Sequence, residues 1–185
     1  PLDPPAYAEN FVKINGTRFH FQDYGAVGKP PMLCLHGGAA NAHWYDFVAQ
    51  GFNADYHVRG VDLRGHGQSP KRTPMPSIEA AAGDVLDLAR REETPLGAIV
   101  GHSFGGKVAL DAAGIGGVAS LEHIMIMDSV PGRRQPVRGG DSAIDVIETL
   151  ESLPSAFESK TEFIDALVAA GRSRGVAQWL AGSTE

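Results

Sequence analysis

The chain has 185 residues, of which 43% are hydrophobic and 21% are charged, and its mean hydropathy is −0.13. This composition indicates a globular domain that buries a sizeable core, and it excludes a disordered or fibrous chain. The net charge is −6, and the basic residues are scattered except for one cluster, Arg133, Arg134 and Arg138, which we interpret as a solvated loop. The sequence therefore shows no basic face of the kind that binds nucleic acid or an anionic membrane.

We expect neither a signal peptide nor a membrane span within the given residues. No apolar run approaches the roughly 20 residues that a membrane span needs. The first ten residues are Pro-rich and acidic, and they lack the basic and apolar regions of a signal peptide. The single cysteine, Cys34, lies in an apolar run, which favours a buried structural side chain over a nucleophile. We therefore expect a cytoplasmic protein without a membrane span.

The first predicted element is a β-hairpin at residues 10–24. Two short alternating segments meet there at Asn15-Gly16, and Asn-Gly is the strongest short-range signal for a hairpin turn. After the Gly/Pro break at 28–31, the run MLCLHG predicts a strand that is covered on both faces. A helix is predicted from the low 40s to about residue 50.

Strands and helices alternate along the next part of the chain. Three further strands are predicted in the runs HVRGVDLRG, LGAIVGHS and HIMIMDSVP, and the last is expected to be buried like the others. Helices are predicted from Ser77 to about Arg91 and from about Phe104 to Ala113. The first of them has an N-cap at Ser77 and one apolar stripe, made of Ile78, Ala81, Ala82, Val85, Leu88 and Ala89. This alternation predicts an α/β fold whose sheet is mostly parallel, with the hairpin at one edge.

The pattern changes at about Asp141. Three helical stretches, DVIETLESL, TEFIDALVAA and VAQWLAG, follow one another with no strand between them. We interpret residues 1–140 as the core and residues 141–185 as the start of a helical cap. The apolar residues of this cap are expected to form its own core rather than a substrate pocket; they are Phe157, Phe163, Leu167, Trp179 and Leu180.

A candidate nucleophile is Ser103, in the motif Gly-His-Ser-Phe-Gly at residues 101–105. The motif G-x-S-x-G is weak by itself, but here it follows a buried strand and opens a helix, as a nucleophile elbow requires. Such a turn lifts the hydroxyl above the carboxyl end of the sheet and aims the helix N-terminus at a developing oxyanion. It also needs small neighbours, which Gly101, Gly105 and Gly106 provide.

Two backbone amides are candidates for an oxyanion hole. Acyl transfer needs two N–H donors that point at the oxygen that becomes negatively charged. The residue after the nucleophile, Phe104, supplies one, and the loop His36-Gly37-Gly38 after the first buried strand supplies the other, which we assign to Gly38.

Three blocks of sequence together resemble the signature of the α/β-hydrolase fold superfamily. They are LHGG at 35–38, DLRGHGQS at 62–69 and GHSFGG at 101–106, in the family's order. The resemblance covers about residues 10–130 and implies a three-layer α/β/α fold with the elbow strand near the centre of the sheet. It also implies that the DLRGHG segment is a structural loop, so His66 is not expected to be catalytic.

The acid of the expected catalytic triad has two alternative positions in the chain. Asp128 ends the strand HIMIMD, next to the elbow strand, and a subgroup of small esterases that is similar around IMIMDSVP and VAQWLA uses an acid at this place. The wider family places its acid one strand later, beyond the helical insertion. In that case Asp128 only anchors a loop.

The histidine base is not identified in this sequence. The family's chain order is Ser, then Asp, then His, and of the seven histidines only His123 follows Ser103. His123 begins the strand that Asp128 ends, so it is expected at the opposite edge of the sheet. We therefore expect the base beyond residue 185 and interpret the chain as ending within the helical insertion.

The function that the resemblance implies is hydrolysis of a small-molecule ester or thioester through an acyl-serine intermediate, with no metal or organic cofactor. Serine-dependent carbon–carbon hydrolases and perhydrolases keep the same serine and remain alternatives. Epoxide hydrolases and dehalogenases resemble members with an aspartate nucleophile, which Ser103 argues against. A non-catalytic ligand-binding protein of the same fold is the alternative from another functional class. Neither the substrate nor the oligomeric state is indicated.

Overall fold

The computed structural model describes residues 6–14, 16–71, 77–92, 95–116, 120–132 and 139–182. The chain divides into two compact units, Pro1–Gly132 and Arg133–Glu185. The expected boundary was at residue 140, and the predicted arginine-rich loop lies outside the described residues. No helix among the described residues is long and apolar enough to cross a membrane.

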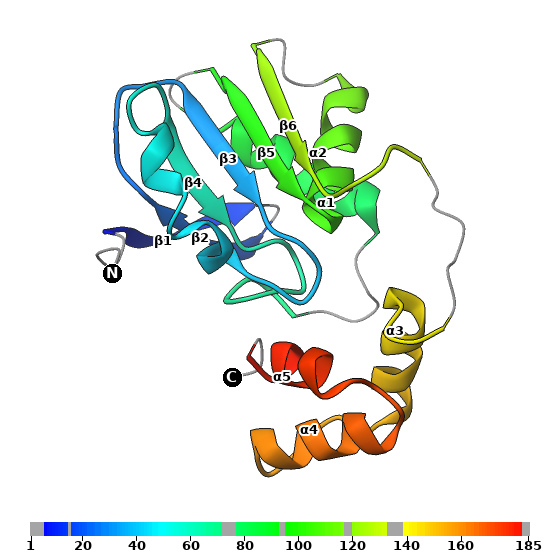
Figure 1. The fold of residues 1–185 in the computed structure, drawn as a ribbon. Helices are drawn as coiled ribbons and strands as arrows, with labels where there is room; N and C mark the ends of the chain where they lie inside the picture. Colours follow the sequence, from blue (N-terminus) through cyan, green and yellow to red (C-terminus); the bar gives the residue numbers. More distant parts are fainter. Residues whose placement is uncertain are drawn as a thin grey trace. The chain divides into compact units, whose positions relative to one another are not determined.

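The first unit is built on a six-stranded sheet in the order β1-β2-β4-β3-β5-β6. Its strands are β1 (Ala8–Ile14), β2 (Thr17–Asp23), β3 (Pro31–Leu35), β4 (His57–Val61), β5 (Ala98–His102) and β6 (His123–Met127). The pairs β4–β3, β3–β5 and β5–β6 are parallel, so the arrows of these four strands point to one edge of the sheet in Figure 1. The predicted α/β class with a mostly parallel sheet is confirmed.

The predicted hairpin forms β1 and β2 at one edge of this sheet. The two strands are antiparallel, Ile14 pairs with Thr17, and Gly16 adopts a φ of +80° in the turn. Glycine is favoured there because a side chain disfavours positive φ. On its other side β2 pairs antiparallel with β4, which joins the hairpin to the parallel part of the sheet.

Strand β3 is buried along its whole length, as its apolar sequence predicted. Leu33 and Leu35 belong to the core on one face of the sheet, while Met32 and Cys34 belong to the core on the other face. The predicted structural role of Cys34 is confirmed by this burial, which raises the pKa of its thiol to about 12 and keeps it protonated.

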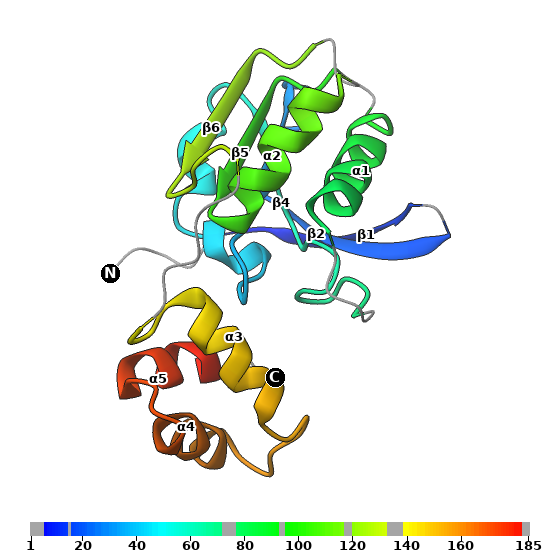
Figure 2. The same cartoon turned by 90° about the vertical axis from the view of Figure 1, so that its right-hand side faces the viewer.

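Helices α1 (Ile78–Ala89) and α2 (Phe104–Ile115) lie side by side on one face of the sheet (Figure 2). Ser77 caps α1 as predicted, because its side chain accepts a hydrogen bond from the Ala80 N–H. The predicted stripe of α1 packs into the core with buried residues of α2 and of β3. These helices cover the face of the sheet to which Leu33 and Leu35 point, and α2 begins directly after the end of β5.

The prediction of one helix from the low 40s to residue 50 was wrong. Two 3-10 helices are present instead, η1 (Ala42–Tyr45) and η2 (Ala49–Phe52). This segment crosses from the carboxyl end of β3 back to the amino end of β4, and 3-10 turns rise further per residue than an α-helix. Tyr45 and Ala49 pack into the core on the second face of the sheet.

The expectation that β6 is buried was also wrong. Strand β6 forms the other edge of the described sheet, and Ile124 and Met125 are 40% and 47% exposed. It pairs with β5 on one side, and no described strand pairs with its other side. The apolar sequence was correctly interpreted as a strand, but burial depends on neighbours that a run of five residues does not specify.

The second unit contains the three predicted helices, α3 (Ala143–Ser152), α4 (Lys160–Ala169) and α5 (Arg174–Gly182). Leu167 and Leu180 are buried, and the rings of Phe157 and Phe163 pack at 5.2 Å. These four residues therefore have the structural role expected for them, whereas Trp179 is half exposed. The interpretation of this unit as the start of a cap remains a prediction.

Candidate active site

Ser103 stands at a sharp turn between β5 and α2. Its φ of 49° and ψ of −110° are unusual for a residue with a side chain, and such a conformation costs about 1–3 kcal/mol. The surrounding backbone holds it, since the Ser103 N–H donates to the Met127 carbonyl at 2.9 Å and the Ser103 carbonyl accepts from the Gly106 N–H at 3.1 Å. The side chain is partly exposed, and its hydroxyl bonds to no described residue.

The glycines around Ser103 are required by close backbone contacts. A Cβ atom at Gly101 would lie 2.4 Å from the Gly105 carbonyl oxygen, and one at Gly105 would lie 2.2 Å from the Leu35 carbonyl oxygen. A Cβ atom at Gly106 would lie 2.7 Å from the Cβ of Ser129. The predicted need for small residues at these three positions is thus explained by the packing of α2 directly against β3, β5 and the end of β6.

The loop after β3 lies against the elbow. The Gly105 N–H donates to the His36 carbonyl at 3.1 Å, and a Cβ atom at Gly37 would lie 3.3 Å from the Cβ of Ser103. Phe104 is the first residue of α2, so its N–H has no acceptor within the helix. The Gly38 N–H likewise makes no hydrogen bond to a described residue. Two unpaired amides therefore belong to the segments that meet at Ser103.

His36 holds this loop as a buried neutral side chain, a role that the sequence analysis missed. Its Nδ1 lies 2.7 Å from the Gly37 carbonyl, and its Nε2 accepts from the Leu63 N–H at 3.1 Å. The Gly37 carbonyl needs a donor and the Leu63 N–H needs an acceptor, so the ring hydrogen of the neutral imidazole is on Nδ1. Burial lowers the pKa of His36 to about 4. The position of His36 in the sequence, between a buried strand and Gly37-Gly38, could have indicated this structural role.

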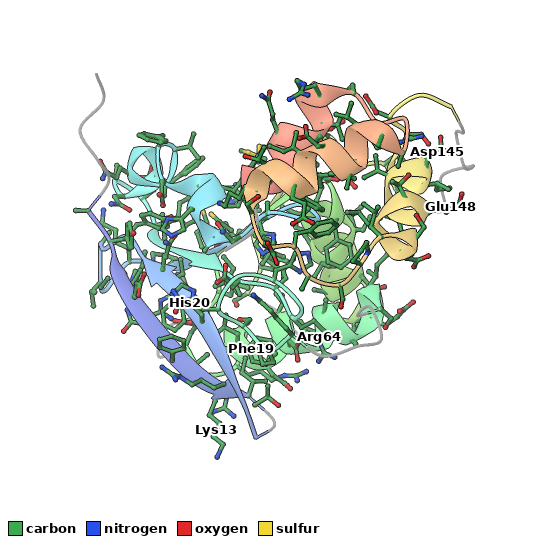
Figure 3. The ribbon with its side chains drawn as sticks, turned by 90° about the horizontal axis from the view of Figure 1, so that it is seen from below. Lys13, Phe19, His20, Arg64, Asp145 and Glu148 are labelled. Atoms are coloured by element: carbon green, nitrogen blue, oxygen red, sulfur yellow. The ribbon has the colours of Figure 1, made fainter. Side chains whose placement is uncertain are left out.

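Asp62 fixes the loop that follows β4. Its buried carboxylate accepts hydrogen bonds from the Ala42 N–H at 2.7 Å and the Gln68 N–H at 2.8 Å, and it pairs with His20 Nδ1 at 2.8 Å. Figure 3 shows His20 on β2 and Arg64 in this loop. A Cβ atom at Gly67 would lie 2.0 Å from the Asp62 carboxylate, which leaves room only for glycine. These contacts describe a structural loop, as the resemblance implied.

Asp128 stands level with Ser103 at the same edge of the sheet. His102 pairs with Met127 in the parallel register, so the next residue on each strand is Ser103 and Asp128. Asp128 has a φ of 47°, its side chain is exposed, and its carboxylate bonds to no described residue. The register places a carboxylate beside the elbow, but it does not by itself give Asp128 a role.

These observations are matched by a comparison with known families. A model described as "alpha/beta hydrolase fold" matches residues 30–163. The chain belongs to the α/β-hydrolase fold family. The expected resemblance is therefore confirmed over the elbow, the loop after β3 and the loop after β4.

The relatives of this α/β-hydrolase chain include several hydrolases. It is 33% identical to mouse epoxide hydrolase 4 over 113 residues, which are 58% of this chain and 31% of that protein. It is 29% identical to mouse protein phosphatase methylesterase 1 over 168 residues, which are 85% of this chain and 41% of that protein. The chain thus spans less than half the length of either relative.

Solved hydrolase structures share the fold. A marine microorganism esterase superposes with a TM-score of 0.73 at 23% identity, covering 89% of this chain and 62% of the esterase. The esterase RhEst1 from Rhodococcus sp. ECU1013 superposes with a TM-score of 0.66 at 26% identity, covering 96% of this chain and 67% of the esterase. These solved structures therefore have the same fold as this chain.

No histidine of this α/β-hydrolase chain is hydrogen-bonded to the candidate nucleophile or the candidate acid. All seven histidines are described, and none bonds to Ser103 or Asp128. His123 lies at the amino end of β6, where its Nδ1 is 3.2 Å from the Tyr56 hydroxyl, so its predicted place at the opposite edge is confirmed. The ring of His66 packs against His36 and Phe104. Among the described residues, Ser103, Phe104, Gly38 and Asp128 follow strands that end at one edge of the sheet, and no histidine bonds to Ser103 or Asp128.

Proposed function

We propose that this chain carries the nucleophile and oxyanion hole of an ester or thioester hydrolase that works through an acyl-serine intermediate. The observation that carries the proposal is the elbow itself. Ser103 is held at positive φ with its hydroxyl unbonded, beside the unpaired amides of Gly38 and Phe104. The Ser103 side chain is partly exposed, so its hydroxyl is accessible to a substrate, as a nucleophile requires.

In the proposed reaction the Ser103 oxygen attacks the acyl carbon, and the carbonyl electrons move onto the carbonyl oxygen. The N–H groups of Gly38 and Phe104 stabilise the negative charge on that oxygen. Collapse of the tetrahedral intermediate breaks the ester bond, and the leaving alkoxide or thiolate takes a proton. Water then hydrolyses the acyl-serine by the same steps and regenerates Ser103.

The proposed reaction needs an imidazole that accepts the Ser103 proton, and the described histidines do not supply one. We assign this base to a part of the protein outside residues 1–185. Asp128 is the proposed acid that orients it; the proposal is supported by its place directly after Met127, the register partner of His102. A carboxylate there stabilises the imidazolium that forms during attack.

The matched relatives include epoxide hydrolases as well as a methylesterase. The elbow residue of this chain favours an acyl substrate over an epoxide. Attack by serine on an acyl carbon gives an ester that water cleaves readily at the carbonyl, and the two free amides are suited to the oxyanion of that step. Acyl and phosphonyl reagents are therefore the appropriate probes.

Labelling with a fluorophosphonate tests the assignment in the full-length protein that contains these residues. Wild type and Ser129→Ala are expected to react, and Ser103→Ala is expected not to react. Ser129 is a suitable control because it lies beside the elbow, with its Cβ next to Gly106. Labelling that persists in Ser103→Ala refutes the assignment. An intact fold without labelling in wild type favours the non-catalytic binding protein. Residues 1–185 alone are expected to hydrolyse no p-nitrophenyl ester.

A further inference from the structure

An apolar patch lies on and just after η1. Trp44, Phe47 and Val48 are 47%, 66% and 52% exposed, although each has a large apolar side chain. Trp44 lies on the 3-10 helix η1, Phe47 follows three residues later, the spacing at which side chains of a 3-10 turn share a side, and Val48 directly follows Phe47. Single exposed apolar residues are ordinary, but three in five positions form a surface that apolar ligands favour.

This patch is connected to the candidate nucleophile through His102. The ring of Trp44 stacks on the ring of His102, with centroids 4.8 Å apart and planes 14° from parallel. His102 directly precedes Ser103, and its Nδ1 would be 2.8 Å from a Cβ atom at Gly37. The Trp44 indole thus packs on the His102 imidazole, and His102 in turn lies next to the elbow and to the loop after β3.

The position of Trp44 is fixed by its neighbours on η1. The Tyr45 hydroxyl donates to the Leu35 carbonyl at 2.8 Å, and the Ala42 N–H donates to Asp62 at 2.7 Å. Leu35 ends β3, directly before the loop that lies against the elbow, and Asp62 holds the structural loop after β4. Half of the Trp44 surface is nevertheless accessible. A fixed aromatic side chain with an accessible surface binds apolar groups with little loss of conformational entropy.

We propose that Trp44 is a specificity-determining residue that, with Phe47 and Val48, binds the apolar chain of an ester substrate held at Ser103. This inference rests on the proposed function. Because Trp44 contacts the residue that precedes Ser103, we expect a medium-length acyl chain at Ser103 to reach the patch and an acetyl group to be too short to do so. Each CH₂ group removed from water contributes up to about 0.8 kcal/mol, so binding favours longer chains.

The test compares kcat/KM for p-nitrophenyl octanoate and p-nitrophenyl acetate in the full-length protein. Trp44→Ala is expected to lower the octanoate-to-acetate ratio about tenfold, which corresponds to about 1.4 kcal/mol. Trp44→Phe keeps an aromatic ring and is expected to retain most of the preference. Val48→Ser is expected to lower the ratio by a smaller factor.

Val27→Ser is the matched control for Val48→Ser. Val27 is 84% exposed and precedes β3, at the amino end of the parallel strands, so this variant is expected to leave the ratio unchanged. Fluorophosphonate labelling of Ser103 in each variant separates the two proposals. Lost labelling in wild type refutes the proposed function, whereas normal labelling with an unchanged ratio in Trp44→Ala refutes the role of the patch. An unchanged ratio with a lowered melting temperature likewise refutes it, and indicates that another segment or a second copy covers the patch.

Discussion

Replacing Gly105 with alanine tests whether the contact between α2 and β3 shapes the candidate site. The added Cβ would lie 2.2 Å from the Leu35 carbonyl oxygen and 2.5 Å from the His36 carbonyl oxygen. Both neighbours are backbone atoms, so no side-chain rotation relieves the clash. Either α2 or the loop after β3 must move by roughly 0.8 Å to restore a separation of 3.0 Å.

The expected energy follows from three contributions. Overpacking of a close contact costs about 1–3 kcal/mol. Displacement weakens the hydrogen bond from the Gly105 N–H to the His36 carbonyl, which contributes about 1 kcal/mol. Alanine offsets part of this loss, because it favours a helix over glycine by about 1 kcal/mol. Gly105→Ala is therefore expected to lower the free energy of unfolding by about 1–3 kcal/mol.

The matched control is Gly114→Ala in the same helix. A Cβ atom at Gly114 would meet no neighbouring atom within 4 Å, so helix propensity alone acts, and stability is expected to rise by up to about 1 kcal/mol. Urea denaturation measures both variants. Esterase activity of the full-length protein is expected to fall about 10²–10³-fold in Gly105→Ala, the scale of one lost oxyanion donor, and to persist in Gly114→Ala. Equal stability and activity of the two variants would refute this account of the elbow.

Three further predictions concern the carboxylates and the histidine around the site. Asp62→Ala is expected to lower the free energy of unfolding by about 3 kcal/mol or more, because it leaves three donors, two of them buried, without an acceptor. A urea midpoint no lower than that of the exposed control Asp55→Ala would contradict this. Burial lowers the pKa of His36 to about 4, from an ordinary value near 6.5. Between pH 4 and pH 6.5 the unfolded chain therefore binds a proton at His36 that the folded chain does not bind. Stability is thus expected to fall by up to about 3 kcal/mol as pH drops from 6.5 to 4, and this share of the pH dependence should vanish in His36→Gln when unfolding is measured across that range. Asp128→Asn is expected to lower kcat on the ~10⁴-fold scale known for a triad acid. The melting temperature is expected to stay unchanged, because asparagine tolerates the positive φ of this position. A near-normal kcat would mean that Asp128 only anchors a loop.

Local sequence patterns were sufficient to predict most elements of the fold. The hairpin at Gly16, the Ser77 cap and the Ser103 elbow each depend on residues adjacent in sequence, so their signals are complete within a few positions. The same is true of the apolar run of β3, because a strand covered on both faces needs apolar residues at every position.

The tertiary structure decided features that depend on distant segments. It showed that β6 is the partly exposed edge of the described sheet and that two 3-10 helices replace the predicted helix after β3. It also showed that His36 is buried and neutral and holds the loop after β3. It also placed Asp128 level with Ser103, since strand register is set by pairing across the sheet. The sequence by itself determined which residues form the elbow, and only the folded sheet decided which amides, carboxylates and aromatic rings lie near it. The physical reason is that backbone conformation follows local preferences, whereas burial, register and protonation follow from what packs against each group.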